Sequence, residues 1–472
     1  MKMPSKRFDF DVAVIGAGSG GFAAARTAAA AGLKTVVIEG GREVGGLCIL
    51  RGCMPSKALL YAAEMRHLAR MGKTWGLRIP KADFNFKQVM ARKDHMIEDF
   101  ASYRRKQLAN AKFQFIRANA WFEDKYTLKL FPLKGASKST PASIRASHFV
   151  IATGSVVSTP PLPQLANAGY MTSDHALTRK NLPKSLIVLG GGAIACELAQ
   201  FFARFDVKVT MIQRSPHILK EFDGDAAEVV EKVLRREGIQ LYTGTQLLDA
   251  SQTPKGKSVT FDHSGKKVGV QAEEILFCLG RQPNTARLGL GDIGVKMDGP
   301  RIIANDQMQT SVPHIYAAGD CTGPHEIVHI AIQQGEIAAK NIAKPKERLK
   351  TDYRLLTSVV FTDPQVAYVG LTEKEAKARK IPYLAASYPF NDHGKSLIME
   401  ALDGFVKLLA NPKNGKIIGG SCVGPLAGEL IHEITAAMAK RMTVHELAVL
   451  PHYHPTLAEI WTYPAEELAD QI

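Results

Sequence analysis

The sequence has few cysteines for its 472 residues and no long apolar segment. Six cysteines are too few for a disulfide scaffold, and Cys196, Cys278, Cys321 and Cys422 stand alone, without the spacing of metal ligands. Glycine or charged residues interrupt the apolar stretches before the roughly 18 residues that a membrane-spanning helix needs. No apolar segment with a small-residue cleavage site follows the basic N-terminus. We therefore expect a cytoplasmic protein that holds no metal and does not bind a membrane.

Acidic residues are outnumbered, with 45 Asp and Glu against 60 Lys and Arg and a formal net charge of +15. This excess favours anionic partners such as nucleic acid, phosphorylated cofactors or anionic surfaces. However, the basic runs at 344–350 and 374–380 contain glutamate, and no aromatic ladder or nucleic-acid motif accompanies them. We interpret these runs as solvated surface, so nucleic acid is not an expected partner. With 46% hydrophobic residues, the chain is typical of a globular protein of about three domains.

A glycine-rich turn near the N-terminus lies between a strand pattern and a helix pattern. The segment DVAVIGAGSGG places Gly16, Gly18 and Gly21 in this turn, and a second strand pattern, KTVVIEG, ends at Glu39. Glycines permit a tight turn and let backbone N–H groups approach a pyrophosphate at the helix N-terminus. A carboxylate at Glu39 can accept hydrogen bonds from the ribose hydroxyls of an adenine dinucleotide. The pattern predicts a dinucleotide site, and a purely structural turn is the alternative.

The same pattern recurs in the segment SLIVLGGGAIACELAQFFARFDVKVTMIQR. It contains Gly190 and Gly192 between an apolar strand pattern and a helix pattern, followed by another strand pattern. Gln213 follows Gly190 at the same distance as Glu39 follows Gly16. The chain is therefore expected to contain two dinucleotide-binding units.

The second unit lacks the carboxylate of the first. A carboxylate would repel the 2′-phosphate of NADP, whereas neutral Gln213, with Arg214 and Lys220 nearby, offers a cationic clamp. This difference favours NADP over NAD. The alternative is that Arg214 and Lys220 are ordinary solvated surface charges.

Two cysteines lie close together in the segment GGLCILRGCMPSK. Cys48 and Cys53 are five residues apart, and five helical residues rise about 7.5 Å, which exceeds the Cα separation of a disulfide. The backbone must therefore depart from a regular helix if the two are to bond. A redox-active pair is favoured over a structural disulfide or two buried thiols. Lys57 follows, beyond Pro55, as a cation that could face an electron-rich cofactor.

Two histidines and a glutamate lie near the C-terminus, in PHYHPTLAEIW. An imidazole of His452 or His454 could relay protons near neutral pH, and the carboxylate of Glu459 could fix its tautomer. The spacing does not distinguish the two histidines, and a surface pair or a weak metal site is the alternative. Before this segment, GFVKLLA, KIIGGSCV and GELIHEITAAMAK predict an antiparallel sheet with helices, a form suited to an interface.

These motifs resemble those of the pyridine nucleotide-disulfide oxidoreductases, the family of dihydrolipoamide dehydrogenase, glutathione reductase and mercuric reductase. GAGSGG, GGLCILRGCMPSK, IATGS, GGGAIACE, CLGRQPNT, SVPHIYAAGD and HPTLAE occur in the family's order along the whole chain. The resemblance implies an α/β fold with two doubly wound dinucleotide-binding domains, for FAD and NAD(P), and an α+β C-terminal dimerisation domain. The expected boundaries are 1–155 and 285–350 for the two parts of the FAD domain, 156–284 for the NAD(P) domain and 351–472 for the dimerisation domain.

The resemblance also implies roles for the reactive residues. Cys53 would be the charge-transfer thiol against the flavin, and Cys48 the interchange thiol that meets the substrate. His454, oriented by Glu459, would relay protons to the cysteines of the other subunit of a homodimer. Lys57 would lie near flavin N5, paired with Glu197. The predicted cofactor-binding residues are Gly16, Gly18, Gly21, Glu39, Gly46, Lys57, Ala120, Thr153, Gly154, Gly190, Gly192, Gln213, Arg214, Lys220, Gly280, Arg281 and Asp320.

The implied enzyme passes electrons between NAD(P)H, flavin, the cysteine pair and a small dithiol or disulfide, with dihydrolipoamide as the first choice. The NADP clamp favours instead a reductase of another disulfide or of a metal ion, and a mainly structural component of an acyltransferase complex is a third possibility. The chain departs from the family pattern at Leu47, Leu50 and Arg51, beside the cysteines. It also lacks the C-terminal cysteine pair of mercuric reductases.

Overall fold

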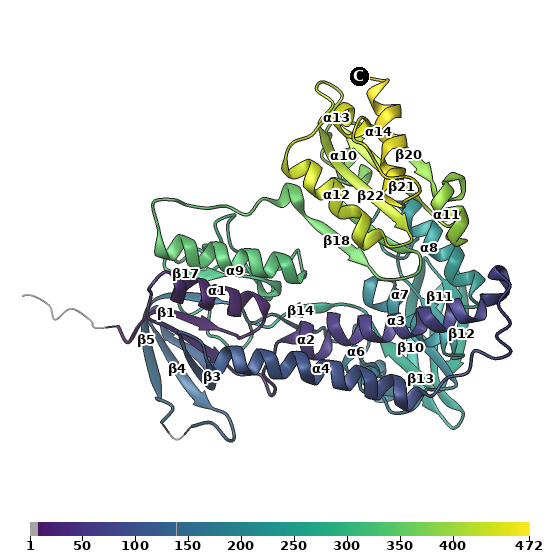
Figure 1. Cartoon of the computed structure of the whole chain (residues 1–472). Coiled ribbons are helices and arrows are strands. Elements are labelled where there is room, and N and C mark those ends of the chain that lie inside the picture. Colours follow the sequence, from purple (N-terminus) through teal and green to yellow (C-terminus); the bar gives the residue numbers. More distant parts are fainter. Residues whose placement is uncertain (1–7, 138) are drawn as a thin grey trace, which may run out of the picture. The chain divides into compact units, whose positions relative to one another are not determined.

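The computed structural model describes residues 8–137 and 139–472 and divides them into two compact units (Figure 1). The first unit contains the chain up to Pro55, Arg92–Ser158 and Gly280–Thr351. The second unit contains Ser56–Ala91, Thr159–Leu279 and Asp352–Ile472. Each unit is therefore built from segments that are distant in the sequence.

A largely parallel sheet forms the centre of the first unit. Its strands are β1 (Phe10–Ile15), β2 (Thr35–Glu39), β3 (Gln114–Asp124), β5 (Ser143–Ile151) and β17 (Ile315–Ala317). β1 pairs in parallel with β2 and β5, β2 with β3, and β5 with β17, while β4 (Thr127–Pro132) joins β3 and β5 by antiparallel pairing. The interior positions of β1 and β2 are Val, Ala and Ile, as expected for strands that are covered on both faces.

Two helices of this unit, α1 (Ser19–Ala30) and α9 (Val328–Ala343), lie side by side against the sheet (Figure 1). Their close approach depends on glycine, because a Cβ atom at Gly335 would lie 2.2 Å from the carbonyl oxygen of Gly20. The helix α1 is the crossover between the parallel strands β1 and β2. It begins directly after the glycine-rich turn, so its N-terminus faces the predicted pyrophosphate position.

The second unit contains a parallel sheet with the strand order β13-β7-β8-β9. The strands are β7 (Ser185–Leu189), β8 (Lys208–Ile212), β9 (Gln240–Tyr242) and β13 (Glu274–Phe277), and the helices between them are α7 (Ala193–Arg204) and α8 (Gly224–Arg236). A separate antiparallel sheet follows β9, made of β10 (Thr245–Thr253), β11 (Gly256–His263) and β12 (Lys266–Ala272). The β7-α7-β8 segment repeats the β1-α1-β2 segment, as the sequence predicts.

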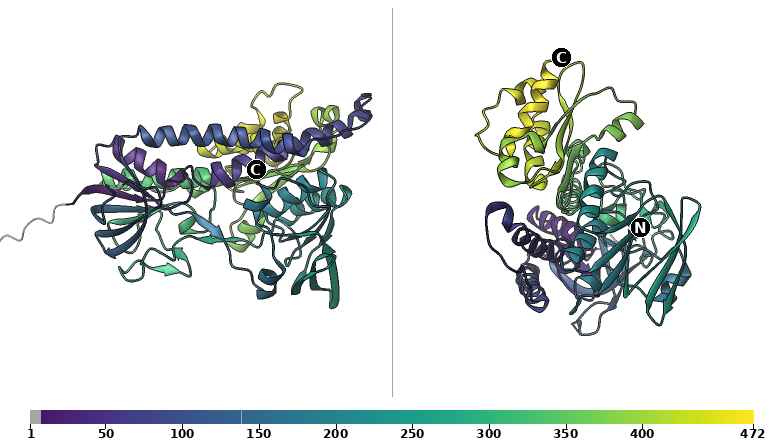
Figure 2. Two further views of the ribbon diagram at one scale, coloured as in Figure 1. Left: turned by 90° about the horizontal axis from the view of Figure 1, so that it is seen from below. Right: turned by 90° about the vertical axis from the view of Figure 1, so that its right-hand side faces the viewer.

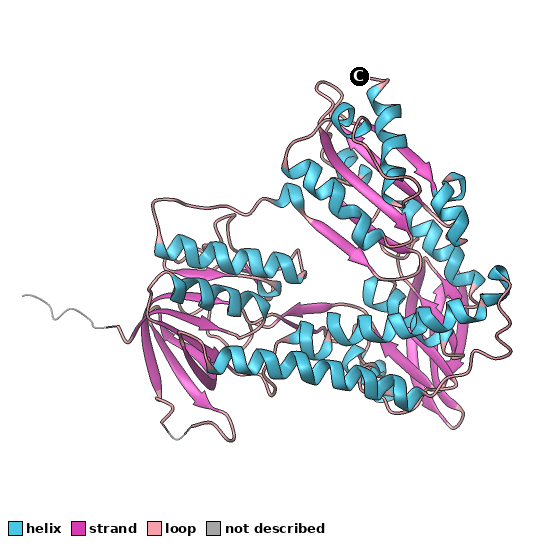
Figure 3. Cartoon of the chain, in the orientation of Figure 1, coloured by secondary structure: helices cyan, strands magenta, loops and turns pink. Residues whose placement is uncertain are grey.

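The C-terminal part of the second unit is a five-stranded antiparallel sheet with helices (Figure 3). Its strands, in spatial order, are β18 (Thr357–Val360), β19 (Gln365–Gly370), β22 (Ile417–Gly424), β21 (Phe405–Ala410) and β20 (Leu384–Pro389). The helices α12 (Ala427–Ala439) and α14 (Thr462–Ala469) pack on this sheet around the fully buried Trp461. The predicted antiparallel sheet with helices is therefore present.

Two long helices, α3 (Cys53–Arg70) and α4 (Phe86–Ala109), are drawn in the purple to blue part of the colour scale in Figure 2. Each of them includes residues of both units. The shorter elements are α2 (Leu47–Arg51), α5 (Pro163–Ala168), α6 (Ser173–Ala176), α10 (Glu373–Ala378), α11 (Gly394–Met399), α13 (Val444–Ala448), β6 (Ser155–Val157), β14 (Arg281–Pro283), β15 (Met297–Asp298) and β16 (Arg301–Ile302). Across the described ranges, no helix is both long enough and apolar enough to cross a bilayer.

Candidate active site

The first glycine turn closes between β1 and α1. The N–H of Gly16 donates to the carbonyl oxygen of Ile38 at 2.8 Å, and the φ of Gly16 is +103°. A Cβ atom at Gly16 would lie 2.3 Å from the carbonyl oxygen of Ala152, so the position excludes any side chain. Gly18 is the N-cap of α1, and a Cβ there would meet nothing within 4 Å. This open backbone at a helix N-terminus suits a pyrophosphate.

The carboxylate of Glu39 is fixed at this turn. It accepts hydrogen bonds from the N–H of Ala17, at 2.7 Å, and from the N–H of Gly41. A carboxylate has about four acceptor positions, so two remain for the ribose hydroxyls of a dinucleotide. Gly46 also lies at the first glycine turn, since a Cβ atom there would lie 2.9 Å from Cα of Gly18.

The remaining predicted cofactor-binding residues of the first unit follow β5 in the sequence. Asp320 accepts a hydrogen bond from the hydroxyl of Ser155 at 2.7 Å, and that hydroxyl accepts from Nε of Arg281 at 2.8 Å. The buried hydroxyl of Thr153 has no hydrogen-bond partner among the described residues, and the adjacent Gly154, with φ of +68°, has open space at its Cβ position. An orphaned hydroxyl beside an open glycine fits a bound polar group.

Ala120, a predicted cofactor-binding residue of this unit, lies away from the first glycine turn. It lies farther along β3, opposite Leu130 of β4, and its side chain is buried in the core. The β3 residues near the turn after β2 are Ala118 and Asn119, because a Cβ atom at Gly40 would lie 2.4 Å from Oδ1 of Asn119. Neither Asn119 nor Ser155 is among the residues predicted from the sequence, although Ser155 is the last residue of the motif IATGS.

The second glycine turn repeats the first in detail. The N–H of Gly190 donates to the carbonyl oxygen of Ile212 at 2.9 Å, its φ is +114°, and a Cβ atom there would lie 2.4 Å from the carbonyl oxygen of Cys278. Gly192 is the N-cap of α7 and has open space around it. The second turn therefore offers the same kind of backbone cradle as the first. Gly280, with φ of +120°, lies two residues beyond Cys278 and belongs to the first unit.

Gln213 lies directly after β8 and is buried over the second turn. Its amide oxygen accepts from the N–H of Arg214 at 3.1 Å, and a Cβ atom at Gly191 would lie 3.0 Å from its amide carbon. The N–H of Leu219 donates to the carbonyl oxygen of Gly191 at 2.7 Å, which holds the backbone next to Lys220 beside the turn. Arg214 and Lys220 are both exposed, and Nζ of Lys220 lies 3.6 Å from Glu221.

The two cysteines of the N-terminal segment lie on either side of a break between helices. Cys48 belongs to α2, and Cys53 begins α3, while Gly52 between them has φ of −134° and ψ of −118°. A Cβ atom at Gly52 would lie 3.1 Å from Cα of Cys48, so the chain folds back against Cys48 just before Cys53. Cys48 is half-buried and Cys53 is exposed. The departure from a regular helix that the spacing requires is thus present.

Lys57, one turn further along α3, is held by a buried carboxylate within the second unit. Its ammonium group lies 2.8 and 3.0 Å from the two oxygens of Glu197, which is on α7 and nearly fully buried. The same carboxylate accepts from the N–H of Phe361 at 2.9 Å, and the Lys57 ammonium lies 4.6 Å from the centre of the Phe361 ring. These contacts fix the direction of the Lys57 side chain.

The two histidines near the C-terminus, His452 and His454, have different contacts. Nδ1 of His454 lies 2.9 Å from Oε2 of Glu459, and the rest of this imidazole is exposed. His452 instead contacts Glu433 at 2.7 Å and the carbonyl oxygen of Leu450 at 2.9 Å. Burial lowers the pKa of His452, but these two acceptors outweigh it and the pKa is raised. Only His454 therefore combines a carboxylate partner with an exposed Nε2.

The four isolated cysteines differ from the pair. Burial raises the pKa of the Cys278 and Cys321 thiols to about 12 and also raises the pKa of Cys196 and Cys422. These thiols therefore stay protonated and unreactive near neutral pH. Within the part of the chain that the structure describes, no three His, Cys, Asp or Glu side chains are grouped as metal ligands.

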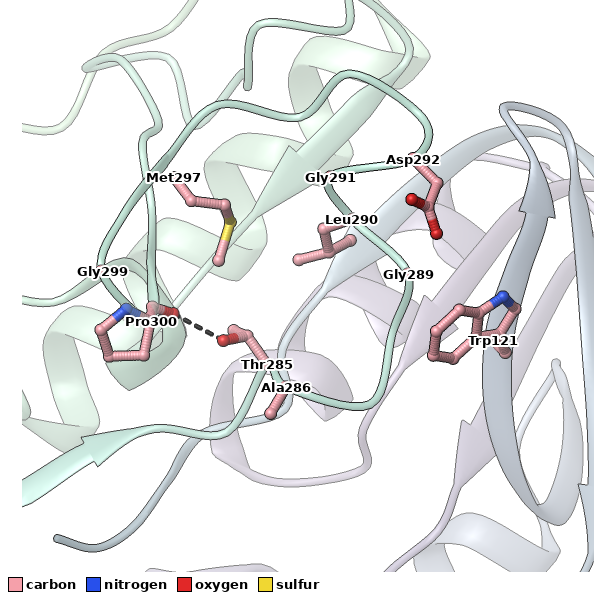
Figure 4. Close-up of a pocket in the computed structure, with 10 residues that line it drawn as sticks. All are labelled: Trp121, Thr285, Ala286, Gly289, Leu290, Gly291, Asp292, Met297, Gly299 and Pro300. Atoms are coloured by element: carbon pink, nitrogen blue, oxygen red, sulfur yellow. Dashed lines mark hydrogen bonds between the residues drawn. The ribbon is translucent and has the colours of Figure 1, made fainter. Parts of the chain in front are cut away.

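A shallow pocket of about 360 Å³ lies elsewhere in the first unit (Figure 4). The indole of Trp121 lies on one side, and the hydroxyl of Thr285 donates to the carbonyl oxygen of Pro300 on another. The lining residues are Trp121, Thr285, Ala286, Gly289, Leu290, Gly291, Asp292, Met297, Gly299 and Pro300. None of these residues belongs to the predicted cofactor or cysteine set.

Two families of known proteins match this sequence, one over the segment with both glycine turns and one over the C-terminal sheet. Residues 10–335 match the sequence family named pyridine nucleotide-disulphide oxidoreductase. Residues 356–465 match the sequence family of the dimerisation domain of these enzymes. This chain belongs to the pyridine nucleotide-disulfide oxidoreductases. It is accordingly an enzyme, an FAD-dependent pyridine nucleotide-disulfide oxidoreductase with a dimerisation domain, which confirms the predicted family, fold class and use of FAD and pyridine nucleotide.

Several relatives match nearly the whole chain. A dihydrolipoyl dehydrogenase of Geobacillus stearothermophilus is 35% identical over 96% of this chain and 95% of the relative. A mitochondrial dihydrolipoyl dehydrogenase of Schizosaccharomyces pombe is 32% identical over 96% of this chain and 88% of the relative. The solved structure of LpdA from Mycobacterium tuberculosis is similar with a TM-score of 0.86 and 28% identity, over 97% of this chain and 99% of that one. The HOCl-induced flavoprotein disulfide reductase RclA from Escherichia coli, with a TM-score of 0.83 and 24% identity over 97% and 99%, shares the fold.

Proposed function

We propose that Cys48 and Cys53 form the redox centre through which this oxidoreductase exchanges electrons with a small dithiol or disulfide. The observation that carries the proposal is the break at Gly52, which directly precedes α3 and where a Cβ atom would lie 3.1 Å from Cα of Cys48. Cys53 lies at the positive end of the α3 dipole, which favours a thiolate there. In this proposal Cys53 is the thiol against the flavin and Cys48 is the thiol that meets the substrate.

The residues around the first glycine turn would hold FAD. Gly16, Gly18 and Gly21 would accommodate its pyrophosphate, Glu39 its ribose, and Asp320 its flavin end. Bound there, FAD would supply the hydride acceptor for the nicotinamide and the route for the electron pair to the disulfide of Cys48 and Cys53. The paired Lys57 would present its ammonium group to the flavin, with its direction set by Glu197.

His454 would act as the proton relay for thiol-disulfide exchange. Because Nδ1 faces Glu459, its exposed Nε2 is the atom that can take a proton from a substrate thiol. The resulting thiolate attacks the sulfur of Cys48, and the electron pair of the broken disulfide bond remains on Cys53 as a thiolate. We propose that His454 serves the cysteines of the partner subunit in a homodimer, which the dimerisation domain would form.

The nicotinamide is proposed to be NADPH in preference to NADH. Buried Gln213 places no negative charge beside the second turn, and exposed Arg214 and Lys220 flank it. Each charge-assisted hydrogen bond to a 2′-phosphate would contribute about 1.5 to 3 kcal/mol, which corresponds to a preference of tenfold or more.

A dihydrolipoamide-type substrate is the first choice, and the relatives named dihydrolipoyl dehydrogenase support it. Such an enzyme could serve an acyltransferase complex in the cytoplasm. The NADPH preference favours the second candidate, a reductase of another small disulfide. The division into an FAD domain (1–155 and 285–350), an NAD(P) domain (156–284) and a dimerisation domain (351–472) belongs to the same proposal.

Anaerobic steady-state kinetics with NADH and NADPH against lipoamide, glutathione disulfide and Hg(II) tests these assignments. We expect turnover with lipoamide and a higher kcat/KM for NADPH. Gln213→Glu with Arg214→Ala should reverse the cofactor order, whereas Lys232→Ala, which removes an exposed charge of α8, should not change it. A preference for NADH that the double substitution leaves unchanged would show that the clamp is ordinary surface charge.

A further inference from the structure

A second histidine contacts the carboxylate that orients His454. His393 precedes α11 and is fully buried, and its Nε2 lies 3.3 Å from Oε1 of Glu459. Glu459 is also nearly fully buried and contacts His454 with both oxygens, at 2.9 and 3.2 Å. One buried carboxylate therefore lies between two imidazoles. The sequence motif HPTLAE contains only one of these histidines, and the other is 66 residues from Glu459 in the sequence.

The hydroxyl of Ser396 decides the tautomer of His393. This buried hydroxyl lies 2.8 Å from Nδ1 of His393 and can either donate or accept there. If Nδ1 carried the proton of a neutral ring, the lone pair of Nε2 would point at the Glu459 carboxylate, which is unfavourable. The favourable arrangement has the Ser396 hydroxyl donating to Nδ1 and the proton on Nε2, facing Glu459. Nε2 of His393 has no well-aligned hydrogen-bond partner among the described residues, so Glu459 is the acceptor available to it.

We propose that His393 is a positioning residue that sets the basicity of His454 by sharing the charge of Glu459. The inference rests on the proposed role of His454 as the proton relay. A donor on Oε1 withdraws negative charge from the carboxylate, so Glu459 stabilises the His454 imidazolium less than it would alone. Burial lowers the pKa of His393, although Glu459 raises it, and the net decrease keeps His393 neutral near pH 7. His393 thus acts as a neutral donor and does not itself move protons.

Other titratable groups surround this array and must be considered in a pH experiment. The ring of Tyr463 on α14 lies 6.4 Å from the His393 ring and stacks on Tyr388 of β20, whose hydroxyl donates to Asp392. The pair of His452 and Glu433 is also within the influence of Glu459, whose charge contributes to the raised pKa of His452. The raised pKa of His452 makes this imidazole a second source of pH dependence, which the experiment must remove.

The test is the pH dependence of dithiol oxidation by the flavin-loaded dimer, with dihydrolipoamide as the probe. In His393→Leu, the acidic limb of the kcat/KM profile should shift upward by about one pH unit, since His454 gains basicity when Glu459 loses a donor. His393→Gln, whose amide nitrogen can take the place of Nε2, should restore the wild-type limb. Ser396→Ala should shift the limb in the same direction by less. Each comparison is repeated in a His452→Gln background, which removes the other titrating imidazole.

A direct measurement supplements the kinetics. In protein labelled with ¹³C at histidine Cε1, the resonance that is lost in His454→Ala reports the His454 pKa, and it should rise in His393→Leu. Equal profiles in wild type and His393→Leu, or equal shifts in the Leu and Gln variants, would reduce His393 to a packing role. If His454→Ala itself leaves dithiol oxidation unchanged, then the proposed relay is wrong. If His454→Ala slows it and the limb stays fixed in His393→Leu, then only the present inference is wrong.

Discussion

The ion pair between Lys57 and Glu197 gives a prediction whose magnitude follows from burial. Glu197 is 4% exposed and holds three contacts, two to the Lys57 ammonium and one to the N–H of Phe361. Breaking a buried ion pair typically costs about 3 to 5 kcal/mol. The Lys57 side chain is 32% exposed, so water can partly solvate its ammonium group once Glu197 is removed. We therefore expect Glu197→Ala to cost about 3 kcal/mol locally, at the lower end of that range.

The N–H of Phe361 provides a local probe for this loss. Since about 1.4 kcal/mol corresponds to a factor of ten, amide exchange in the peptide containing Phe361 should accelerate about 100-fold in Glu197→Ala. In Glu197→Gln the amide oxygen can still accept from Phe361, so the acceleration should stay below about tenfold. Glu228→Ala, an exposed acid on α8, is the matched control and should leave exchange unchanged.

A double-substitution cycle isolates the pair itself. Lys57→Met leaves the buried carboxylate of Glu197 without its cation, whereas Lys57→Met with Glu197→Gln removes both charges. The loss of stability in the double variant should therefore be smaller than the sum of the losses in the two single variants, by about 1 to 3 kcal/mol. Hydrogen exchange measured by mass spectrometry gives these values without assuming that the whole flavoprotein unfolds in one step. If Glu197→Ala exchanges at the wild-type rate, or if the two single effects simply add, then the pair does not fix Lys57.

Further predictions concern the glycine turns and the buried thiols. Gly190→Ala should abolish nicotinamide binding in a titration calorimeter while flavin absorbance remains, because the new Cβ would clash with the Cys278 carbonyl, whereas Gly16→Ala should lose the flavin. Reduced native protein treated with iodoacetamide at pH 8 should be alkylated at Cys48 and Cys53, and labelling of Cys321 or Cys422 before unfolding would contradict their burial. Because the thiols of Cys278 and Cys321 have a folded pKa of about 12, against an unfolded value near 9, the free energy of unfolding should be unaffected by them below pH 9 and should fall between pH 9 and 12.

Much of the site was predictable from local patterns in the sequence. The glycine turns, Glu39 and Gln213 appear where the two strand-turn-helix-strand segments place them, because a βαβ segment fixes its own turn. The break between Cys48 and Cys53 also follows from their spacing, since a continuous helix would separate them too far. These features depend on residues that are close in the chain.

Other features depend on contacts between distant residues and left no local pattern. The bond from Phe361 to Glu197 spans 164 residues, and the contact of His393 with Glu459 joins an irregular segment to a short helical turn. The position of Ala120 in the core, with Asn119 beside Gly40, depends on where β3 changes from its parallel partner β2 to its antiparallel partner β4. The distinction between His452 and His454 also required the structure, because their separate acids come from different elements.

The most direct test of the electron path is an anaerobic titration of the flavin-loaded enzyme with one equivalent of NADPH or NADH, followed by differential alkylation and mass spectrometry. We expect two thiols per chain to become newly available, at Cys48 and Cys53. In Cys53→Ser no new thiol should appear at Cys48, since it then has no partner to be reduced from. Reduction of the flavin without any new thiol in this segment, or new thiols at other cysteines, would contradict the account.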